Sequence, residues 1–159
     1  MEGLNPLGGR FQSIHAYSVQ SGTVDNKGAT GDQLTFVVLH EKIELLTFGF
    51  EVMAAGGAVT IASQLRLDKI PVNNGTRVNG VNANATVTWA GASASIYSIV
   101  TSNLDLYASA VAPSPVPGPV TRPTAVRGDV LIVNLITAGT GAGAQTCRPF
   151  ILFRERPLT

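Results

Sequence analysis

The sequence predicts an all-β protein, an antiparallel β-sandwich or a jelly-roll-like barrel with long loops and little helix. Short apolar segments with a period of two recur along the chain, and turns rich in Gly and Asn separate them. About nine segments have a strand pattern, and a helical pattern competes in one of them only. Many short strands with little helix are typical of two packed sheets.

The chain length predicts one domain after a short arm. A protein of 159 residues usually forms a single domain and buries about 70% of its unfolded surface. We expect a flexible N-terminal arm at 1–10, where Gly and Pro exclude periodic structure, and a single β domain at 11–159. The N-terminus has no signal-peptide pattern, and a lone cysteine excludes an internal disulfide, so we expect synthesis in a reducing cytoplasm.

The first strands are expected before residue 55. Phe11 to Val19 is a weak strand candidate, and Gln20 to Gln33 reads as a polar turn region. Leu34 to Leu39 is apolar on both faces, which indicates a buried strand. In Ile43 to Met53, strict alternation places Leu46, Phe48, Phe50 and Val52 on one face and Ile43, Leu45, Thr47 and Gly49 on the other. Gly49 predicts a bulge or a close backbone approach.

The middle of the chain alternates strands and turns. Val59 to Ile70 has the clearest period of two, with Leu65 and Leu67 inward and Arg66 and Asp68 toward water. Residues 71–85 hold Asn74-Gly75 and Asn79-Gly80, which favour type I′ turns, so a long exposed loop or small hairpin is expected. Further strands are expected at Thr86 to Trp89 and at Ala94 to Val100. Leu104 to Val111 fits a strand or a helix, and the β surroundings favour the strand.

The last third begins with five prolines at 111–123, which impose an extended course and exclude a helix or central strand. This segment is either a crossover between sheets or an arm that binds a partner. Val130 to Ile136 is apolar on both faces and should be a central strand. A Gly-rich tip at 138–144 would join it to Cys147 to Arg156 as a long terminal hairpin.

Short motifs in the chain have structural interpretations that we favour. Gly139 to Gly143 lacks the Lys and the helix of a phosphate-binding loop, so we expect a hairpin tip. Arg127-Gly128-Asp129 matches an integrin-binding tripeptide but is better explained as the entry to a strand. Asn74 and Asn84 begin glycosylation sequons, which we interpret as Asn in turns.

Catalytic and ligand-binding patterns are weak. His15 and His40 lack a third metal ligand in the sequence pattern, and the ten acidic residues show no paired motif. Cys147 is expected to be a packed strand residue, although the neighbouring Arg148 could lower its pKa. Trp89, Tyr97 and Tyr107 could form a sugar-stacking platform, but core or interface packing is favoured. We therefore expect no enzyme, no cofactor and no metal site.

The charge content points to a surface that is partly covered. Asp, Glu, Lys and Arg make up 13% of the chain, against about 25% in ordinary domains. A net charge of +1 offers no basic face for nucleic acid, and no apolar stretch reaches the roughly 20 residues of a membrane span. We expect protein partners instead.

In character the chain resembles tailed-bacteriophage virion proteins, and among them the small capsid decoration, or cement, proteins. The resemblance lies in the strands from Ile43 to Ile70, the entry Gly128 to Leu131, the loop Gly139 to Gly143 and the closing Phe150 to Phe153. It implies a small β-rich protein, often a jelly roll, that is made in the host cytoplasm and sits on the capsid surface of the virion. It also implies the major capsid protein as partner and self-association as a homotrimer or dimer.

Other roles stay open at this point: a head-tail or tail-surface structural protein, a carbohydrate-binding module that uses Trp89, or a small hydrolase that uses His40. For the assembly role we expect partner contacts in the arm, the Asn-rich loop and the Pro-rich segment, at Leu4, Pro6, Asn74, Arg77, Asn79, Pro115, Pro117, Pro119 and Arg122.

Overall fold

The computed structural model describes residues 23–25, 28–54, 59–89, 99–104, 106–107, 120–141 and 146–156, and these contain strands but no helix. The predictions for residues 1–22, 94–98, 108–119 and 142–145 therefore lie outside the described residues. The strands are β1 Val24–Asp25, β2 Gly31–Val37, β3 Lys42–Ala54, β4 Val59–Ile61, β5 Ser63–Ile70, β6 Thr86–Trp89, β7 Ile99–Asn103, β8 Leu106–Tyr107, β9 Val120–Thr121, β10 Thr124–Val126, β11 Val130–Thr137, β12 Thr140–Gly141 and β13 Thr146–Glu155.

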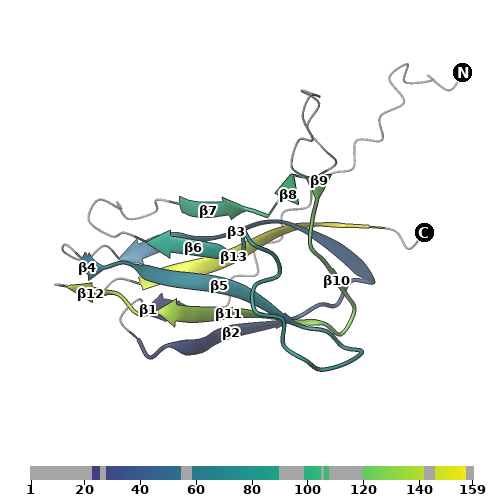
Figure 1. Cartoon of the computed structure of the whole chain (residues 1–159), viewed down its shortest axis with the longest axis horizontal. Helices are drawn as coiled ribbons and strands as arrows, with labels where there is room; N and C mark the ends of the chain where they lie inside the picture. Colours follow the sequence, from purple (N-terminus) through teal and green to yellow (C-terminus); the bar gives the residue numbers. More distant parts are fainter. Residues whose placement is uncertain are drawn as a thin grey trace, which may run out of the picture.

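Two antiparallel sheets pack against each other (Figure 1). The β3 sheet has the order β1-β13-β3-β10, and β7 pairs with the other half of β3. The β11 sheet has the order β2-β11-β5-β6. The prediction of an all-β antiparallel sandwich is confirmed, and the sheets do not close into a barrel. No helix in the described part of the chain is long and apolar enough to cross a membrane.

Both sheets fill the space between them with large apolar side chains. The most deeply buried include Leu45, Phe48, Phe50 and Val52 from β3, Leu67 from β5, and Val133 and Leu135 from β11. Trp89 of β6 is buried as well, and its ring packs against Phe50 at 5.3 Å between centroids and 45° between planes. The expectation that Trp89 packs in the core is therefore confirmed.

A bulge in β3 changes the predicted faces of that strand. Leu152 pairs with Thr47 but Phe153 pairs with Leu45, which leaves Leu46 without a partner on β13. Because the extra residue reverses the alternation, Leu45 and Phe48 both point into the core. The prediction that they lie on opposite faces is wrong. The close approach predicted at Gly49 is confirmed, since a Cβ there would lie 2.5 Å from the carbonyl oxygen of Val100.

The terminal hairpin predicted from residues 130–156 does not form. β11 pairs with β2 and β5 and is central in its sheet, as predicted, but β13 belongs to the other sheet and pairs with β3 and β1. Both strands have apolar residues on the side that faces the core. This sequence pattern does not distinguish two neighbouring strands of one sheet from two strands in opposite sheets. The ten residues of β13 find a longer partner in the thirteen residues of β3.

Other boundaries differ from the predictions. The segment from Val59 to Ile70 breaks at Ala62 into β4 and β5, and regular structure begins at β1 and Gly31, inside the predicted turn region. β7 runs on to Asn103, beyond the predicted end at Val100. β8 supports the strand interpretation of the segment after Leu104. β6 matches its prediction residue for residue.

Candidate interaction surface

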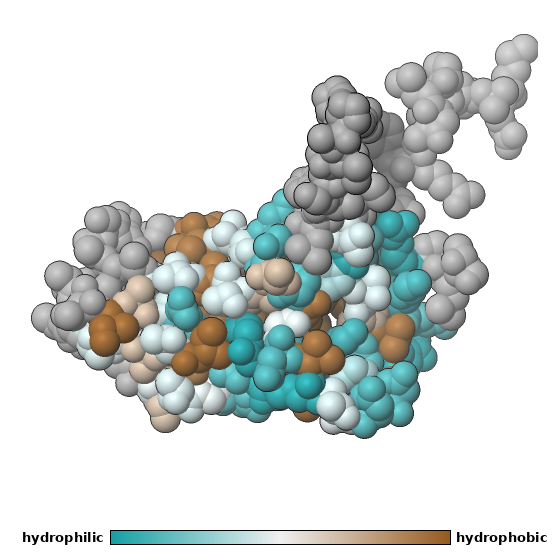
Figure 2. Space-filling view, in the orientation of Figure 1, coloured by the Kyte–Doolittle hydropathy of each residue, from teal (hydrophilic) through white to brown (hydrophobic). Residues whose placement is uncertain are grey.

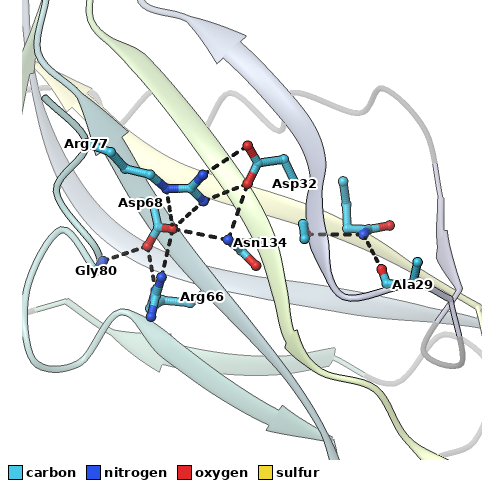
Figure 3. A network of polar contacts seen from close by, with 9 residues as sticks. Ala29, Asp32, Arg66, Asp68, Arg77, Gly80 and Asn134 are labelled. Carbon is cyan, nitrogen blue, oxygen red and sulfur yellow. Dashed lines mark hydrogen bonds and ion pairs between the residues drawn. The ribbon is translucent and has the colours of Figure 1, made fainter. Parts of the chain in front are cut away.

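A buried carboxylate anchors the Asn-rich loop at 71–85 to the outer face of the β11 sheet. Leu65 and Leu67 fill the inner face, so Asp68 lies on the outer face, yet it is fully buried because the loop folds over it. Figure 3 shows Arg77 and Gly80 of the loop pointing toward this carboxylate. The prediction that Asp68 points to water is wrong, because alternation identifies a face of the sheet but not what covers it.

The hydrogen bonds around Asp68 use both carboxylate oxygens. Arg66 donates from Nε and Nη2 at 2.6 and 3.1 Å, Arg77 donates from Nε and Nη2 at 3.0 and 2.6 Å, and the Gly80 N–H donates at 2.6 Å. Arg77 also donates to both oxygens of Asp32 on β2, at 2.9 and 2.6 Å. Burial would raise the pKa of Asp68, but the hydrogen bonds from Arg66, Gly80 and Arg77 hold that pKa below its ordinary value.

The loop is therefore a fixed structural element. Lys69 and Val78 exchange backbone hydrogen bonds at 3.0 and 2.7 Å, and the Val81 N–H donates to the Leu67 carbonyl at 2.8 Å. Gly75 and Gly80 have φ of 63° and 74°, as their predicted turn positions require. A small hairpin and a long exposed loop are the two expected forms of this segment. The Lys69–Val78 bridge closes a short hairpin, and the tip of the segment is exposed, so the structure has features of both.

A second buried carboxylate, Asp129, joins three segments at one end of the sandwich. Its Oδ1 accepts from the Val72 N–H at 2.9 Å, and its Oδ2 accepts from the Val126 N–H at 3.0 Å. Its backbone carbonyl accepts from the Val38 N–H at 2.9 Å, and the Gly128 N–H donates to the Val38 carbonyl at 2.9 Å. Arg127-Gly128-Asp129 leads into β11, so it is a strand entry, as expected. Asp129 is 2% exposed, and its buried carboxylate is not accessible to an integrin.

The segments that Asp129 joins carry four exposed aliphatic side chains, Val37, Leu39, Val72 and Val126. We call these four residues and the adjoining Arg127 the end surface. The four aliphatic side chains are between 39% and 75% exposed. The Arg127 Nε donates to the Leu39 carbonyl at 3.1 Å, and Val72 lies against Gly128, where a Cβ would be 2.8 Å from its Cγ2. On the face drawn in Figure 2, brown apolar residues lie in separate patches among hydrophilic ones.

Two hollows adjoin the end surface. A charged hollow of about 510 Å³ is lined by Glu41, Lys42, Arg127, Glu155 and Arg156 together with Leu39 and His40. An apolar groove of about 390 Å³ runs between β2 and β13 and includes Phe36, Val38, Ile43, Ile151 and Phe153. The centroid of the His40 ring lies 5.4 Å from that of Phe153, and the His40 Nδ1 contacts the Glu155 carboxylate.

The predicted contact residues lie at different places in the chain, and their role as partner contacts stays a prediction. Asn74 and Asn79 are exposed on the loop, and Asn74 accepts from the Thr76 N–H at 2.9 Å. Arg77 is committed to Asp32 and Asp68, and Arg122 is half-buried. The positions Leu4, Pro6, Pro115, Pro117 and Pro119 lie outside the described residues. None of the nine belongs to the end surface, although the apolar run from Phe36 to Leu39 is a sequence signal for it.

The described residues offer little for catalysis. They contain no group of three or more His, Cys, Asp or Glu side chains that could hold a metal ion. Cys147 is buried beside Val24, and burial raises the pKa of its thiol to about 12, so Arg148 does not activate it. Trp89 is 3% exposed, and a buried ring cannot stack on a sugar. Thr140–Gly141 forms strand β12, which pairs with β4, and β11 and β13 lie in different sheets, so the prediction of a hairpin tip at Gly139 to Gly143 is wrong.

Comparison with known proteins identifies no relative: no family model, no curated protein and no solved structure matches the chain. We therefore infer function from the chain's own surface. Its most distinctive described features are the end surface and the two buried carboxylates that hold the segments carrying it.

Proposed function

We propose that this protein is a structural component of a bacteriophage virion that binds the outer surface of the capsid and stabilises contacts between capsid subunits. Its partner is the major capsid protein, and it acts as a homotrimer or dimer. The observation that carries the proposal is the end surface, an apolar surface presented by three segments that hydrogen bonds tie together.

The end surface has the properties of an interface centre. Such centres are depleted in charge, and a standard interface buries about 800 Å² on each partner. The only charged member of the end surface is Arg127, a residue type that is enriched in interfaces. Since Asp129 fixes the backbone at Val38, Val72 and Val126, little conformational entropy is lost when a partner binds.

The composition supports the same proposal. Charged residues are 13% of the chain, so a large part of its surface lacks the charges that keep isolated proteins soluble. A decoration protein contacts several neighbours and has less free surface to solvate. A head-tail or tail-surface protein would share this property, and the binding experiment below separates the two roles.

The test is binding of the purified chain to empty, expanded shells of the cognate major capsid protein. We expect saturable co-sedimentation with the shells and a rise in their melting temperature. Leu39→Asp should weaken binding at least tenfold, because about 1.4 kcal/mol corresponds to a factor of ten and burying an unpaired carboxylate costs more.

Ile99→Asp is the matched control. Ile99 is also exposed, at 65% against 75% for Leu39, but it lies on β7, away from the end surface. It should bind like the native chain, and circular dichroism should show both variants folded. Binding to connector or tail assemblies instead of shells would refute the capsid role, and equal loss in both variants would refute the assignment of the end surface.

A further inference from the structure

Two Asn-Gly pairs lie in the Asn-rich loop, Asn74-Gly75 and Asn79-Gly80. In such a pair the backbone nitrogen of the glycine can attack the side-chain carbonyl carbon of the asparagine. Glycine is the neighbour that permits this attack best, because it has no Cβ to obstruct the approach. The two pairs have the same chemistry, but the structure surrounds them differently.

The attacking nitrogen of the second pair is held by a buried carboxylate. The Gly80 N–H donates to Oδ1 of Asp68 at 2.6 Å, and hydrogen bonds to a charged group are the stronger kind. The nitrogen must lose its proton to form the new bond, and a negative charge beside it disfavours that loss. The backbones of Val78 and Val81, on either side of the pair, are bonded to β5. Asn79-Gly80 is therefore fixed in an unreactive arrangement.

The first pair lies at the exposed tip of the loop. Asn74 and Gly75 are both exposed, and a Cβ built at Gly75 would meet no atom within 4 Å apart from its chain neighbours. The Gly75 N–H donates to the Pro71 carbonyl at 2.9 Å, which is a bond between neutral groups within the tip. Breaking this bond disturbs no strand of the sandwich, so the Gly75 nitrogen becomes available far more easily than that of Gly80.

The Asn74 side chain is held in a conformation that favours the attack. Its Oδ1 accepts from the Thr76 N–H at 2.9 Å. This bond closes a small ring that contains both the attacked carbon and the Gly75 nitrogen, which limits their separation. The Thr76 N–H also points at the oxygen on which negative charge develops during the attack, and a positioned donor at such an oxygen stabilises the transition state.

Asn82 shows why both features are needed. Its Oδ1 accepts from the Asn84 N–H at 3.0 Å, which resembles the contact at Asn74. However, its Nδ2 donates to the Leu104 carbonyl at 2.6 Å, and the next residue is Ala83, whose Cβ obstructs the attack. Of Asn74, Asn79 and Asn82, Asn74 alone combines a following glycine with a bonded side-chain oxygen and an exposed position.

We propose that Asn74 is a site of spontaneous deamidation in the native protein and that Asp68 protects Asn79 from the same reaction. The Gly75 nitrogen forms a bond to Cγ of Asn74 while the bond from Cγ to Nδ2 breaks, and the side-chain nitrogen leaves as ammonia with the proton from Gly75. Water then opens the resulting succinimide ring at either carbonyl, which gives aspartate or isoaspartate. The reaction is independent of the proposed function, and its product adds a carboxylate two residues from Val72 of the end surface.

Peptide mass spectrometry of the full-length chain, incubated at mildly alkaline pH, tests the difference between the two sites. In the native chain we expect Asn74 to deamidate at least tenfold faster than Asn79, because Gly80 must first break its bond to Asp68. In guanidinium chloride the two rates should become similar, since both sites are then unfolded Asn-Gly pairs. Equal rates in the native chain would overturn the proposal. A difference that persists unchanged after unfolding would overturn it too, because its cause would be the local sequence.

A pair of variants at Thr76 tests the contribution of its N–H. Thr76→Pro removes this donor and should slow the deamidation of Asn74 several-fold in the folded chain, whereas Thr76→Ser keeps the donor and should react like the native chain. Thr76 is exposed at the loop tip, and circular dichroism checks that both variants are folded. The rates in guanidinium chloride measure the effect that proline has on the reaction without the fold. If Thr76→Pro reacted as fast as Thr76→Ser in the folded state, the N–H would have no part in the reaction.

Discussion

Replacing Asp68 with Asn should destabilise the protein strongly, although the two side chains have nearly the same shape. The carboxylate accepts hydrogen bonds from two guanidinium groups and one backbone N–H, and it is fully buried. The amide of Asn carries no charge, and its NH₂ group is a donor facing other donors. The variant thus leaves Arg66 beside a neutral group, while Arg77 keeps only its ion pair with Asp32.

The expected loss is about 2–3 kcal/mol of unfolding free energy. Removing one partner of a buried ion pair costs about 3–5 kcal/mol. The side chains of Arg66 and Arg77 remain 25% and 29% exposed, so water can solvate them in part and the cost falls below that range. With a urea m-value of about 2 kcal/mol/M, the unfolding midpoint should fall by about 1–1.5 M.

Urea unfolding at pH 7 measures this loss, and its pH dependence gives a second readout. The folded-state pKa of Asp68 is lowered, so its stabilisation is fully present above the unfolded value of about 3.9 and is lost as pH falls through the lower folded value. The difference between native chain and variant should therefore be constant from pH 7 to about pH 5 and shrink below about pH 4.

Glu41→Gln is the control, because it removes the same charge from an exposed side chain. It should change stability by no more than about 0.5 kcal/mol. If Asp68→Asn lost under about 1 kcal/mol, or if the difference persisted unchanged at pH 2, the carboxylate would not anchor the loop as described.

Two further predictions concern the β3 sheet. Gly49→Ala should cost about 1–3 kcal/mol in urea unfolding, because the new Cβ would meet the Val100 carbonyl oxygen at 2.5 Å and Phe150 at 3.0 Å; a change below 0.5 kcal/mol would mean that β7 moves aside freely. The Cys147 thiol, with its pKa raised to about 12, should not react with a disulfide reagent at pH 8 until urea unfolds the chain, and rapid reaction of the native protein would contradict its burial.

The sequence pattern predicts the fold class because alternation is a local property of each strand. It predicts β6 residue for residue and the central position of β11. It does not predict which sheet receives β13, since inward apolar residues look the same in either sheet. It also misses the bulge at Leu46, because a bulge is visible only when the partner strand is known.

The candidate surface is harder to predict for a related reason. Val37 and Leu39 look like core residues in the sequence, since they stand in an apolar run, and their exposure depends on where β2 ends in the sandwich. Arg77 looks like a free surface cation, and its role depends on Asp32 and Asp68, which are distant in the sequence. Charged residues were assigned to water by pattern, but the fold uses several of them internally.

This internal use strengthens the argument for assembly. At least five of the ten acidic residues form ion pairs with Lys or Arg within the chain: Asp32, Glu44, Glu51, Asp68 and Asp129. Burial would raise the pKa of Glu44, but Arg156 and Arg154 hold it below its ordinary value, so this group too stays charged and paired. Charges that are paired within the chain contribute less to the solubility of its surface than free charges do. The outer surface is therefore poorer in unpaired charge than the 13% content indicates, and we expect the native chain to self-associate unless a partner covers it.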